Sequence, residues 1–367
     1  MKRVLFLTNY PSPYRVRFFD ELGKHMDVTV LFSDRAELKK HRSASWYVED
    51  EGNFRRVQLT KRLATIGNSD LCRDVIGWLR QPFDAIVLCG YATPTAMLAI
   101  SYMRLHKIPF WMEVDGGLIR EESRLKYRFK RALVSAASWW LSTGRDTTRY
   151  LVHYGAREEN IHVYPFTSLQ EADLLPEPVS RERKAALRQE LGMPENHVVL
   201  SIGQFIHRKG FDVLLKAAAE LDGDTGIYIV GGEPTEEYLQ LREDLKLKNV
   251  HFVGFQKKEE LALYYQAADV FALPTREDIW GLVINEAMAY GLPVVTTEKC
   301  VAGQELVENG VNGYLIPVDD HETLAQKLAA ILTGNLSAMG KAALEKVRPY
   351  TIENMAKVHV EIFDRQE

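Results

Sequence analysis

The sequence predicts an α/β protein with two domains, each built on a parallel β-sheet. Short apolar runs alternate with longer amphipathic stretches along the chain, which is the pattern of parallel strands joined by crossover helices. The 367 residues exceed what one ordinary hydrophobic core accommodates and are enough for two α/β domains. The alternation is interrupted at residues 167–178, where Pro176 and Pro178 break the periodicity.

In the first half, buried strands are expected wherever several apolar residues follow one another. These runs are Val4–Leu7, Val28–Phe32, Ala85–Leu88, Phe110–Glu113, Trp139–Ser142 and Ile161–Val163. Helical periodicity lies between them, at Tyr14–Leu22, Thr95–Leu105 and Leu125–Ala136. Residues 1–170 are therefore predicted to form the first domain.

The second half repeats this alternation after a helix predicted at Ser180–Leu191. Its apolar runs are Val198–Ile202, Ile227–Val230, Val250–Phe252, Val270–Ala272, Pro293–Thr296 and Gly313–Ile316. We predict a second domain over residues 171–349, with the boundary near residues 168–195. The final helical stretch, Tyr350–Phe363, either closes the second domain or crosses back to brace the first, so residues 350–367 are compatible with both.

Composition restricts the class of protein. The 46% hydrophobic and 26% charged residues are typical of a soluble globular chain. The cysteines are too far apart for a zinc site or a disulfide framework, so a cytoplasmic protein is expected: Cys72, Cys89 and Cys300. No apolar window of about eighteen residues is present, so no membrane-spanning segment is predicted.

The net charge of −4 is unevenly distributed along the chain. Residues 1–170 contain 26 Lys and Arg against 18 Asp and Glu, whereas residues 171–367 contain 20 against 32. A basic first half predicts an anionic partner. Nucleic acid is disfavoured because no helix-turn-helix, zinc-finger or RNA-binding signature is present. A phosphorylated acceptor fits better, as does a peripheral contact with the anionic inner face of a membrane.

Ligands of open α/β sheets bind beyond the carboxyl ends of the strands. The densest polar loop follows the predicted strand Val270–Ala272 and leads into a helix that should begin near Gly281. The first backbone N–H groups of that helix, at Gly281, Leu282 and Val283, lack intrahelical partners and favour a diphosphate. Glu286 lies about one and a half turns further in, and its side chain tilts back toward the helix start. Its carboxylate can accept hydrogen bonds from a vicinal diol such as that of ribose.

Asp278 stands in the loop before this helix, where it can face whatever lies beyond the phosphates. A structural alternative is that Glu286 only caps or pairs within its own helix, as a lone acidic residue usually does. Two acidic residues at fixed spacing around a glycine-led helix start favour the functional interpretation.

A second polar loop follows the predicted strand Val198–Ile202. Gly203 and Gly210 bracket two adjacent cations, Arg208 and Lys209. Arg208 offers a planar fork for phosphate oxygens and Lys209 a mobile point charge, so both could stabilise a diphosphate leaving group. Alone this loop is a weak signal, because basic surface loops are common, but paired with the first loop it is informative.

The first half offers candidate acceptor-side residues at its own strand ends. Tyr91, Asp115 and Gly116 each follow a predicted strand, and the first loop leads into Tyr14 and Arg15. All of them are at the carboxyl edge of the predicted sheet, where they can line a ligand site. The glycines at 116 and 117 are also compatible with a simple turn.

An apolar stripe of Leu125, Phe129 and Leu133 runs through a cation-rich stretch. Such a stripe is more often a helix packing on its own sheet, and this is the interpretation that we favour. The alternative is an interfacial helix that docks on anionic lipid.

Together the polar loops resemble the motifs of group 1 (family 4) retaining glycosyltransferases. The resemblance rests on Arg208-Lys-Gly-Phe-Asp212 and on Asp278-Ile-Trp-Gly-Leu-Val-Ile-Asn-Glu286. It covers residues 197–320 strongly and the first half only in general layout. It implies a GT-B fold, in which two Rossmann-like domains face each other across a cleft. It also implies a nucleoside-diphosphate sugar as donor substrate, with no cofactor and no metal.

By this resemblance, Gly281–Val283 hold the phosphates, Glu286 the ribose hydroxyls, and the backbone near Phe255 the base. Asp278 stands where the family has a glutamate that contacts the transferred sugar, and the neighbouring Glu277 is an alternative for that role. The remaining donor-side residues lie within the same motifs: Gly203, Ile279 and Trp280.

The chain departs from the family pattern in three places. Gln204 replaces a common arginine, Asp115 is nearest to a common histidine, and the first loop lacks a glycine run. These departures leave the contacts at those positions open.

The sequence thus predicts a retaining transferase that moves a hexose-type sugar from a UDP or GDP sugar to a saccharide or lipid-linked saccharide, in cell-surface glycan assembly. Arg208, Lys209 and Asp278 are the predicted catalytic residues. The alternatives are a nucleotide-sugar epimerase or synthase of the same fold, and a non-catalytic nucleotide-sugar-binding subunit. A nicotinamide dehydrogenase is disfavoured, because no G-x-G-x-x-G follows the first strand of either domain.

Overall fold

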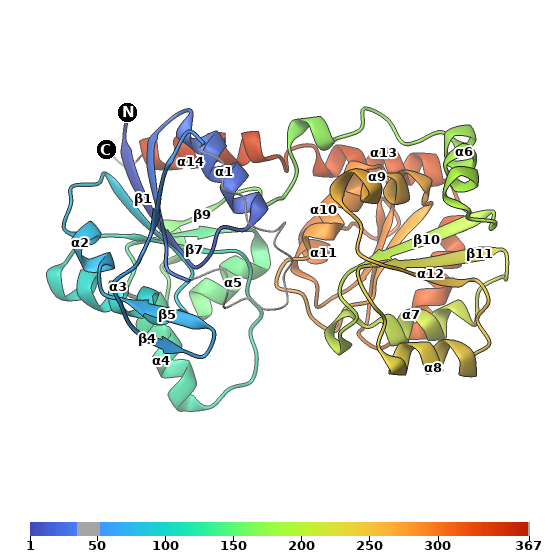
Figure 1. Ribbon diagram of the computed structural model, residues 1–367, viewed down its shortest axis with the longest axis horizontal. Helices are drawn as coiled ribbons and strands as arrows, with labels where there is room; N and C mark the ends of the chain where they lie inside the picture. The colour runs from blue at the N-terminus through green and yellow to red at the C-terminus, as the bar shows by residue number, and fades with distance from the viewer. Residues whose placement is uncertain (35–51, 366–367) are drawn as a thin grey trace. The chain divides into compact units, whose positions relative to one another are not determined.

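The computed structural model describes residues 1–34 and 52–365, and the chain divides into two compact units (Figure 1). Unit 1 comprises Met1–Ser168 and Tyr350–Glu367, and unit 2 comprises Leu169–Pro349. Each unit is a parallel sheet with helices on both faces, so the predicted α/β fold class is confirmed.

Within the described residues, unit 1 contains a seven-stranded parallel sheet in the order β3-β2-β1-β6-β7-β8-β9. Val4 of β1 pairs with Val28 of β2 on one side and with Ala85 of β6 on the other. The chain order reverses between β1 and β6, which is the switch point where such sheets place ligands. The strands are β1 (Arg3–Thr8), β2 (Asp27–Phe32), β3 (Arg55–Gln58), β6 (Ala85–Cys89), β7 (Trp111–Val114), β8 (Trp139–Ser142) and β9 (Ile161–Val163).

Helices cover both faces of this sheet. Figure 1 shows α1 and α14 above the sheet and α2, α3 and α5 below it. The C-terminal helix α14 packs on α1, with the ring of His359 centred 4.7 Å from that of Phe18, and Lys2 Nζ donates to the Phe363 carbonyl at 2.9 Å. The helices are α1 (Pro13–Gly23), α2 (Val75–Leu79), α3 (Pro94–His106), α4 (Arg124–Val134), α5 (Arg145–His153) and α14 (Ile352–Asp364).

Among the residues that the structure describes, three strands have no counterpart in the sequence prediction. They are β3 and the antiparallel pair β4 (Arg62–Ile66) and β5 (Ser69–Cys72). All of β4 and most of β3 are exposed, so neither contains the apolar run that marks a buried strand.

The favoured interpretation of the apolar stripe on α4 is wrong. Leu133 is buried at 8% exposure, but Leu125 is 79% exposed and Phe129 is 54% exposed. The helix packs through its C-terminal end and through the side opposite the stripe, so most of the stripe faces solvent.

Unit 2 contains a second parallel sheet among the described residues, six-stranded and ordered β12-β11-β10-β13-β14-β15. All six apolar runs predicted for this half form strands. The order reverses between β10 and β13, so the loops that follow these two strands lie side by side. The strands are β10 (His197–Ile202), β11 (Thr225–Val230), β12 (Val250–Val253), β13 (Val270–Leu273), β14 (Val294–Thr297) and β15 (Gly313–Ile316).

Helices α9, α10 and α13 lie on one side of the second sheet, and α7, α8 and α12 on the other (Figure 1). The helices of unit 2 are α6 (Arg181–Leu191), α7 (Phe211–Ala218), α8 (Glu236–Asp244), α9 (Lys258–Ala267), α10 (Leu282–Ala289), α11 (Val301–Leu306), α12 (His321–Leu332) and α13 (Leu336–Val347). Among the residues that the structure describes, no helix has the length and apolar character needed to span a bilayer.

Candidate active site

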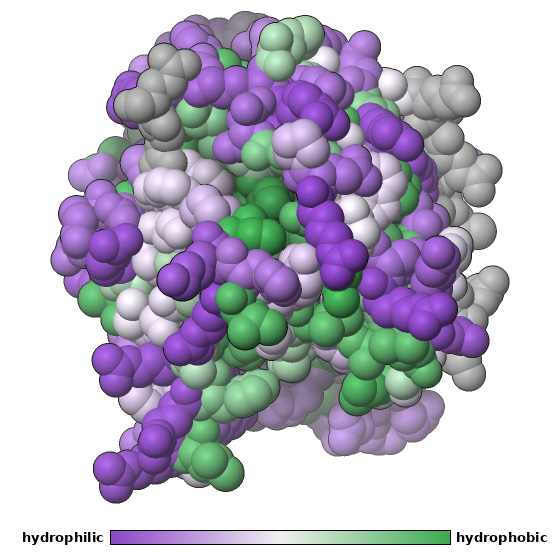
Figure 2. Space-filling model, turned by 90° about the vertical axis from the view of Figure 1, so that its left-hand side faces the viewer, coloured by the Kyte–Doolittle hydropathy of each residue, from purple (hydrophilic) through white to green (hydrophobic). Residues whose placement is uncertain are grey.

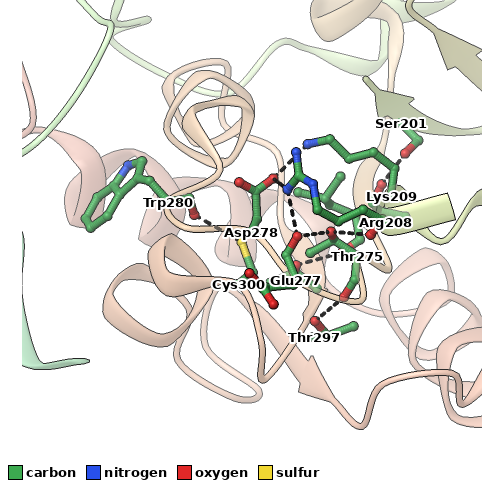
Figure 3. A network of polar contacts seen from close by, with 12 residues as sticks. Ser201, Arg208, Lys209, Thr275, Glu277, Asp278, Trp280, Thr297 and Cys300 are labelled. Atoms are coloured by element: carbon green, nitrogen blue, oxygen red, sulfur yellow. Dashed lines mark hydrogen bonds and ion pairs between the residues drawn. The ribbon is translucent and has the colours of Figure 1, made fainter. Parts of the chain in front are cut away.

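The loops that follow β10 and β13 are tied together by backbone and side-chain hydrogen bonds (Figure 3). The Arg208 carbonyl accepts from Arg276 N at 2.8 Å and from Thr275 Oγ1 at 2.8 Å. Gly210 makes this close approach possible, because a Cβ at its position would lie 2.0 Å from the Pro274 carbonyl oxygen. Its φ of 69° is also a conformation that favours glycine. The two predicted polar loops therefore form one surface.

The three predicted catalytic side chains meet on this surface. Lys209 Nζ lies 2.7 Å from Asp278 Oδ2, and Arg208 NH1 lies 3.4 Å from the same oxygen. Lys209 and Asp278 are 12% and 13% exposed, whereas Arg208 is 44% exposed. A largely desolvated ion pair thus stands beside a more accessible cation.

Glu277, the alternative to Asp278, contributes its backbone to this arrangement. Its carbonyl oxygen accepts from Arg208 NH1 at 2.7 Å and from Thr275 Oγ1 at 3.0 Å. The carboxylate that engages both cations is that of Asp278, whereas Glu277 contributes its carbonyl oxygen.

Helix α10 begins beside the same carboxylate. Gly281 is its N-cap, with a φ of 98°, and no acidic residue occupies its first turn. A Cβ at Gly281 would lie 3.8 Å from Asp278 Cγ and 2.8 Å from Cys300 Sγ. The first N–H groups of the helix, at Leu282 and Val283, have no intrahelical acceptor and lie at the end of the helix beside the ion pair, where the helix dipole favours an anion.

Glu286 lies half-buried on α10, and one of its carboxylate oxygens accepts from Tyr265 OH at 3.0 Å. Tyr265 is 2% exposed and its ring stacks on Tyr290, with centroids 5.1 Å apart. Burial and the nearby Glu286 carboxylate raise the pKa of the Tyr265 hydroxyl, so it stays a donor. Tyr265 thereby orients the carboxylate predicted to bind a diol.

The other predicted donor-side residues differ in their exposure to solvent. Ile279 is 51% exposed and Phe255, just after β12, is 61% exposed, so both are available to a ligand. Trp280 is only 4% exposed and its indole N–H donates to Asn285 Oδ1 at 2.9 Å, so it supports the loop from inside. Gly203 directly follows β10 and lies beneath the Lys209 side chain, since a Cβ there would lie 3.2 Å from Lys209 Cε.

Sequence reasoning missed three residues that build this site: Cys300, Tyr265 and Arg276. Cys300 is fully buried beneath Gly281, and burial together with Asp278 raises the pKa of its thiol to about 12. Arg276 forms a two-pronged ion pair with Asp212, with N–O distances of 2.9 and 2.6 Å, which ties the β13 loop to α7. For Cys300 a signal existed, because it follows the end of predicted strand Pro293–Thr296.

In unit 1, the predicted acceptor-side residue Arg15 is buried rather than presented to a ligand. Its side chain is 4% exposed and forms ion pairs with Glu113, at 2.7 Å, and with Asp115. Burial raises the pKa of Asp115. At Glu113 burial is opposed by the Arg15 guanidinium, by His359 and by hydrogen bonds with Cys89 and Tyr164, and together these groups lower the pKa of that carboxyl. Arg15 therefore positions Asp115, which is 34% exposed and remains the accessible member of the group.

The other acceptor-side candidates lie on the same edge of the unit 1 sheet. Tyr14 packs on Phe166, and burial raises the pKa of its hydroxyl to about 12. Tyr91 shares a hydrogen bond with the hydroxyl of Tyr150. Gly116 is half-buried next to Asp115. Its neighbour Gly117 touches Tyr150, and a Cβ there would lie 2.5 Å from that ring.

Chemically, the unit 2 site combines cations, open helical N–H groups and an oriented carboxylate. The first two can stabilise the negative charge of a diphosphate, and the third can accept hydrogen bonds from a diol. A nucleoside diphosphate presents both of these groups, a diphosphate and the ribose diol.

The fold identifies the class more narrowly. The structure superposes on sucrose-phosphate synthase from Thermosynechococcus elongatus with a TM-score of 0.76 at 18% identity, covering 100% of this chain and 99% of that one. It superposes on HepE of Anabaena, solved in complex with UDP and glucose, with a TM-score of 0.75 at 21% identity, covering 100% of both chains. Both superpositions identify the fold of this chain as the GT-B fold of glycosyltransferases.

Sequence models identify the family. Residues 183–346 match the model described as "Glycosyl transferases group 1", and residues 14–167 match the model described as "Glycosyl transferase 4-like domain". Together the two models account for both units. The chain belongs to the group 1 glycosyltransferases.

Curated relatives agree with this assignment. D-inositol 3-phosphate glycosyltransferase of Xylanimonas cellulosilytica is 29% identical over 262 residues, which are 68% of this chain and 60% of that protein. The enzyme of the same name from Corynebacterium aurimucosum is 31% identical over 226 residues, 58% of this chain and 52% of that protein. The match thus spans little more than half the length of these relatives.

Proposed function

We propose that this chain is a retaining glycosyltransferase that moves a hexose-type sugar from a UDP or GDP sugar to a saccharide or lipid-linked saccharide. The observation that carries the proposal is the meeting of Lys209 and Asp278 with the start of α10. Membership in the group 1 family supports the reaction class. The UDP and glucose of the HepE complex support a nucleotide-sugar donor.

The donor diphosphate is placed against the N–H groups of Leu282 and Val283, with Arg208 and Lys209 on its other side. Glu286, held by Tyr265, then accepts the ribose hydroxyls. Phe255, exposed after β12, flanks the base, and Asp278 lies beyond the phosphates toward the sugar.

In the transfer step, the bond between the anomeric carbon and the donor phosphate oxygen breaks, and a bond from that carbon to the acceptor oxygen forms. The electron pair of the broken bond goes to the nucleoside diphosphate, where Arg208, Lys209 and the helix dipole stabilise the growing charge. The proton of the acceptor hydroxyl goes to the leaving diphosphate. The acceptor enters on the face that the diphosphate leaves, so the anomeric configuration is retained.

The acceptor is assigned to the carboxyl edge of the unit 1 sheet, around Asp115 and Tyr91. This edge presents a carboxylate and phenolic hydroxyls, which suit the hydroxyl groups of a saccharide. A role in cell-surface glycan assembly, on the cytoplasmic side and in peripheral contact with an anionic membrane, completes the proposal. The basic first half of the chain supports that contact.

The test is to incubate the purified protein with candidate UDP and GDP sugars and saccharide acceptors and to determine the anomeric configuration of the product by NMR. An α-linked product from an α-linked donor is expected. A β-linked product would contradict retention, and donor binding without transfer or hydrolysis would favour a non-catalytic subunit. Transfer by Glu286→Ala, which removes the carboxylate proposed to bind the ribose, is compared with transfer by Glu361→Ala. The second variant is the control, because it removes a glutamate from α14 of unit 1.

A further inference from the structure

Helix α4 leaves large apolar side chains in solvent. Leu125 and Phe129, one turn apart, are 79% and 54% exposed, and Ile119 in the preceding loop is 51% exposed. On the face of unit 1 in Figure 2, apolar surface reaches the solvent directly beside strongly polar surface. Single exposed apolar residues are ordinary, but neighbouring ones on one helix indicate a contact surface.

The helix is anchored on its opposite side, so the exposed stripe does not result from a loosely packed element. Val134 is fully buried, Tyr127 OH donates to the His153 carbonyl at 3.2 Å, and Lys130 Nζ lies 2.8 Å from Glu122 Oε2. At about 100° per residue, Leu125 and Phe129 point away from these anchors.

Cations flank the stripe on both sides. The sequence of α4, RLKYRFKRALV, contains five cations and no acidic residue. Arg124 and Arg128 lie along one border of the stripe and Lys126 along the other, and all three are exposed. Cations in the first turn oppose the helix dipole, so their presence there is unfavourable for the isolated helix.

We propose that α4, with Ile119 in the loop before it, is the docking surface of this protein on an anionic lipid bilayer. The helix lies in the membrane interface with Leu125 and Phe129 among the acyl chains. The exposed side chains of Arg124, Lys126 and Arg128 reach the headgroups. The inference extends the proposed function, since such docking brings the enzyme to a lipid-linked acceptor.

Charge complementarity favours a lipid bilayer over a second copy of this chain as the partner of the α4 surface. A helix with five cations and no acid repels itself across a symmetric interface, but a surface of anionic headgroups attracts the three exposed cations that border the stripe. An apolar stripe bordered by Lys and Arg is also the pattern of helices that bind in the membrane interface.

The test is flotation with vesicles of phosphatidylcholine alone and of equal parts phosphatidylcholine and phosphatidylglycerol. The wild type is expected to float with the anionic vesicles at low salt and to be released at high salt, because salt screens exposed charges. Leu125→Ser/Phe129→Ser is expected to lower the partition coefficient about tenfold or more. Arg124→Gln/Arg128→Gln is expected to weaken binding to the anionic vesicles only.

The matched control is Leu63→Ser/Ile66→Ser, which removes a similarly exposed apolar pair, 58% each, from β4. This control should float like the wild type. Hydrolysis of the donor without acceptor is measured on every variant, because it reports the unit 2 site independently of docking. Equal flotation of the wild type and the Leu125→Ser/Phe129→Ser variant would overturn the proposal, as would no flotation of the wild type. If the wild type does not hydrolyse the donor at all, that result would instead contradict the proposed function.

Discussion

Replacing Lys209 with methionine removes one charge from the candidate active site and keeps a side chain of similar length. The ammonium lies 2.7 Å from Asp278 Oδ2, in a pair whose side chains are both less than one-seventh exposed. After the substitution, Asp278 keeps only the contact with Arg208, at 3.4 Å from a guanidinium that is 44% exposed. The variant therefore weakens both the leaving-group site and the fixation of the carboxylate.

The magnitude follows from these contacts. Loss of one preorganised electrostatic group typically lowers kcat about 10²–10³-fold, roughly 3–4 kcal/mol of activation free energy. For stability, a buried acceptor deprived of one partner costs about 1–3 kcal/mol, and the lower half applies because Arg208 remains. In a domain of the size of unit 2, each kcal/mol lowers Tm by about 2–4 °C.

Initial rates of sugar transfer and thermal unfolding of the wild type and Lys209→Met measure both effects. The control is Lys216→Met, which removes an exposed lysine from α7 and should change neither rate nor Tm. A Lys209→Met enzyme with the turnover of the wild type would refute the assignment of this cation to the leaving group. A fall in rate accompanied by loss of folded protein would be uninformative about chemistry, so both readouts are taken on the same preparation.

Three further outcomes are expected. Gly210→Ala should destabilise unit 2 by about 2–5 kcal/mol, because the new methyl group meets the Pro274 carbonyl in a strained backbone; thermal unfolding against Gly223→Ala, which meets no atom within 4 Å, measures this. Iodoacetamide at pH 8 should leave the native thiols unlabelled by mass spectrometry, since burial raises the pKa of Cys72 to about 11 and of Cys300 to about 12; rapid labelling of Cys300 would contradict its placement. Excess EDTA should not lower transfer, because Arg208 and Lys209 neutralise the leaving group, and a loss restored by a divalent ion would show otherwise.

Much of the fold could be predicted because buried parallel strands are nearly continuous apolar runs. β1 and β10 illustrate this, since both are almost wholly buried along their length. The hairpin of β4 and β5 has no such run, and the sequence did not predict it: β4 is exposed throughout, and β5 alternates half-buried and buried residues, of which Asp70 is polar. Its strands are held by local pairing, which leaves little apolar signal in the sequence.

The candidate site was predictable to the extent that it lies at strand ends. Arg208, Lys209 and Asp278 were found because their loops follow β10 and β13, which are neighbours in the sheet. The burial of Arg15 between two carboxylates could not be foreseen, because the partner acids are about 100 residues away in the chain. The exposure of α4 was mispredicted for a related reason. An apolar stripe predicts that one face of a helix makes an apolar contact, but the sequence does not say whether that contact is with the chain's own sheet or with another surface.

The proposed function requires above all that a diphosphate binds at the start of α10, opposite Arg208 and Lys209. Calorimetric titration of the wild type and of Gly281→Ala with UDP, GDP and the corresponding nucleosides tests it directly. The account predicts that one nucleoside diphosphate binds the wild type far more tightly than its nucleoside. It also predicts that Gly281→Ala loses this preference, because the added methyl group collides with Cys300 Sγ and displaces the helix start. Diphosphates that bind no better than nucleosides, or that bind both proteins equally, would contradict it.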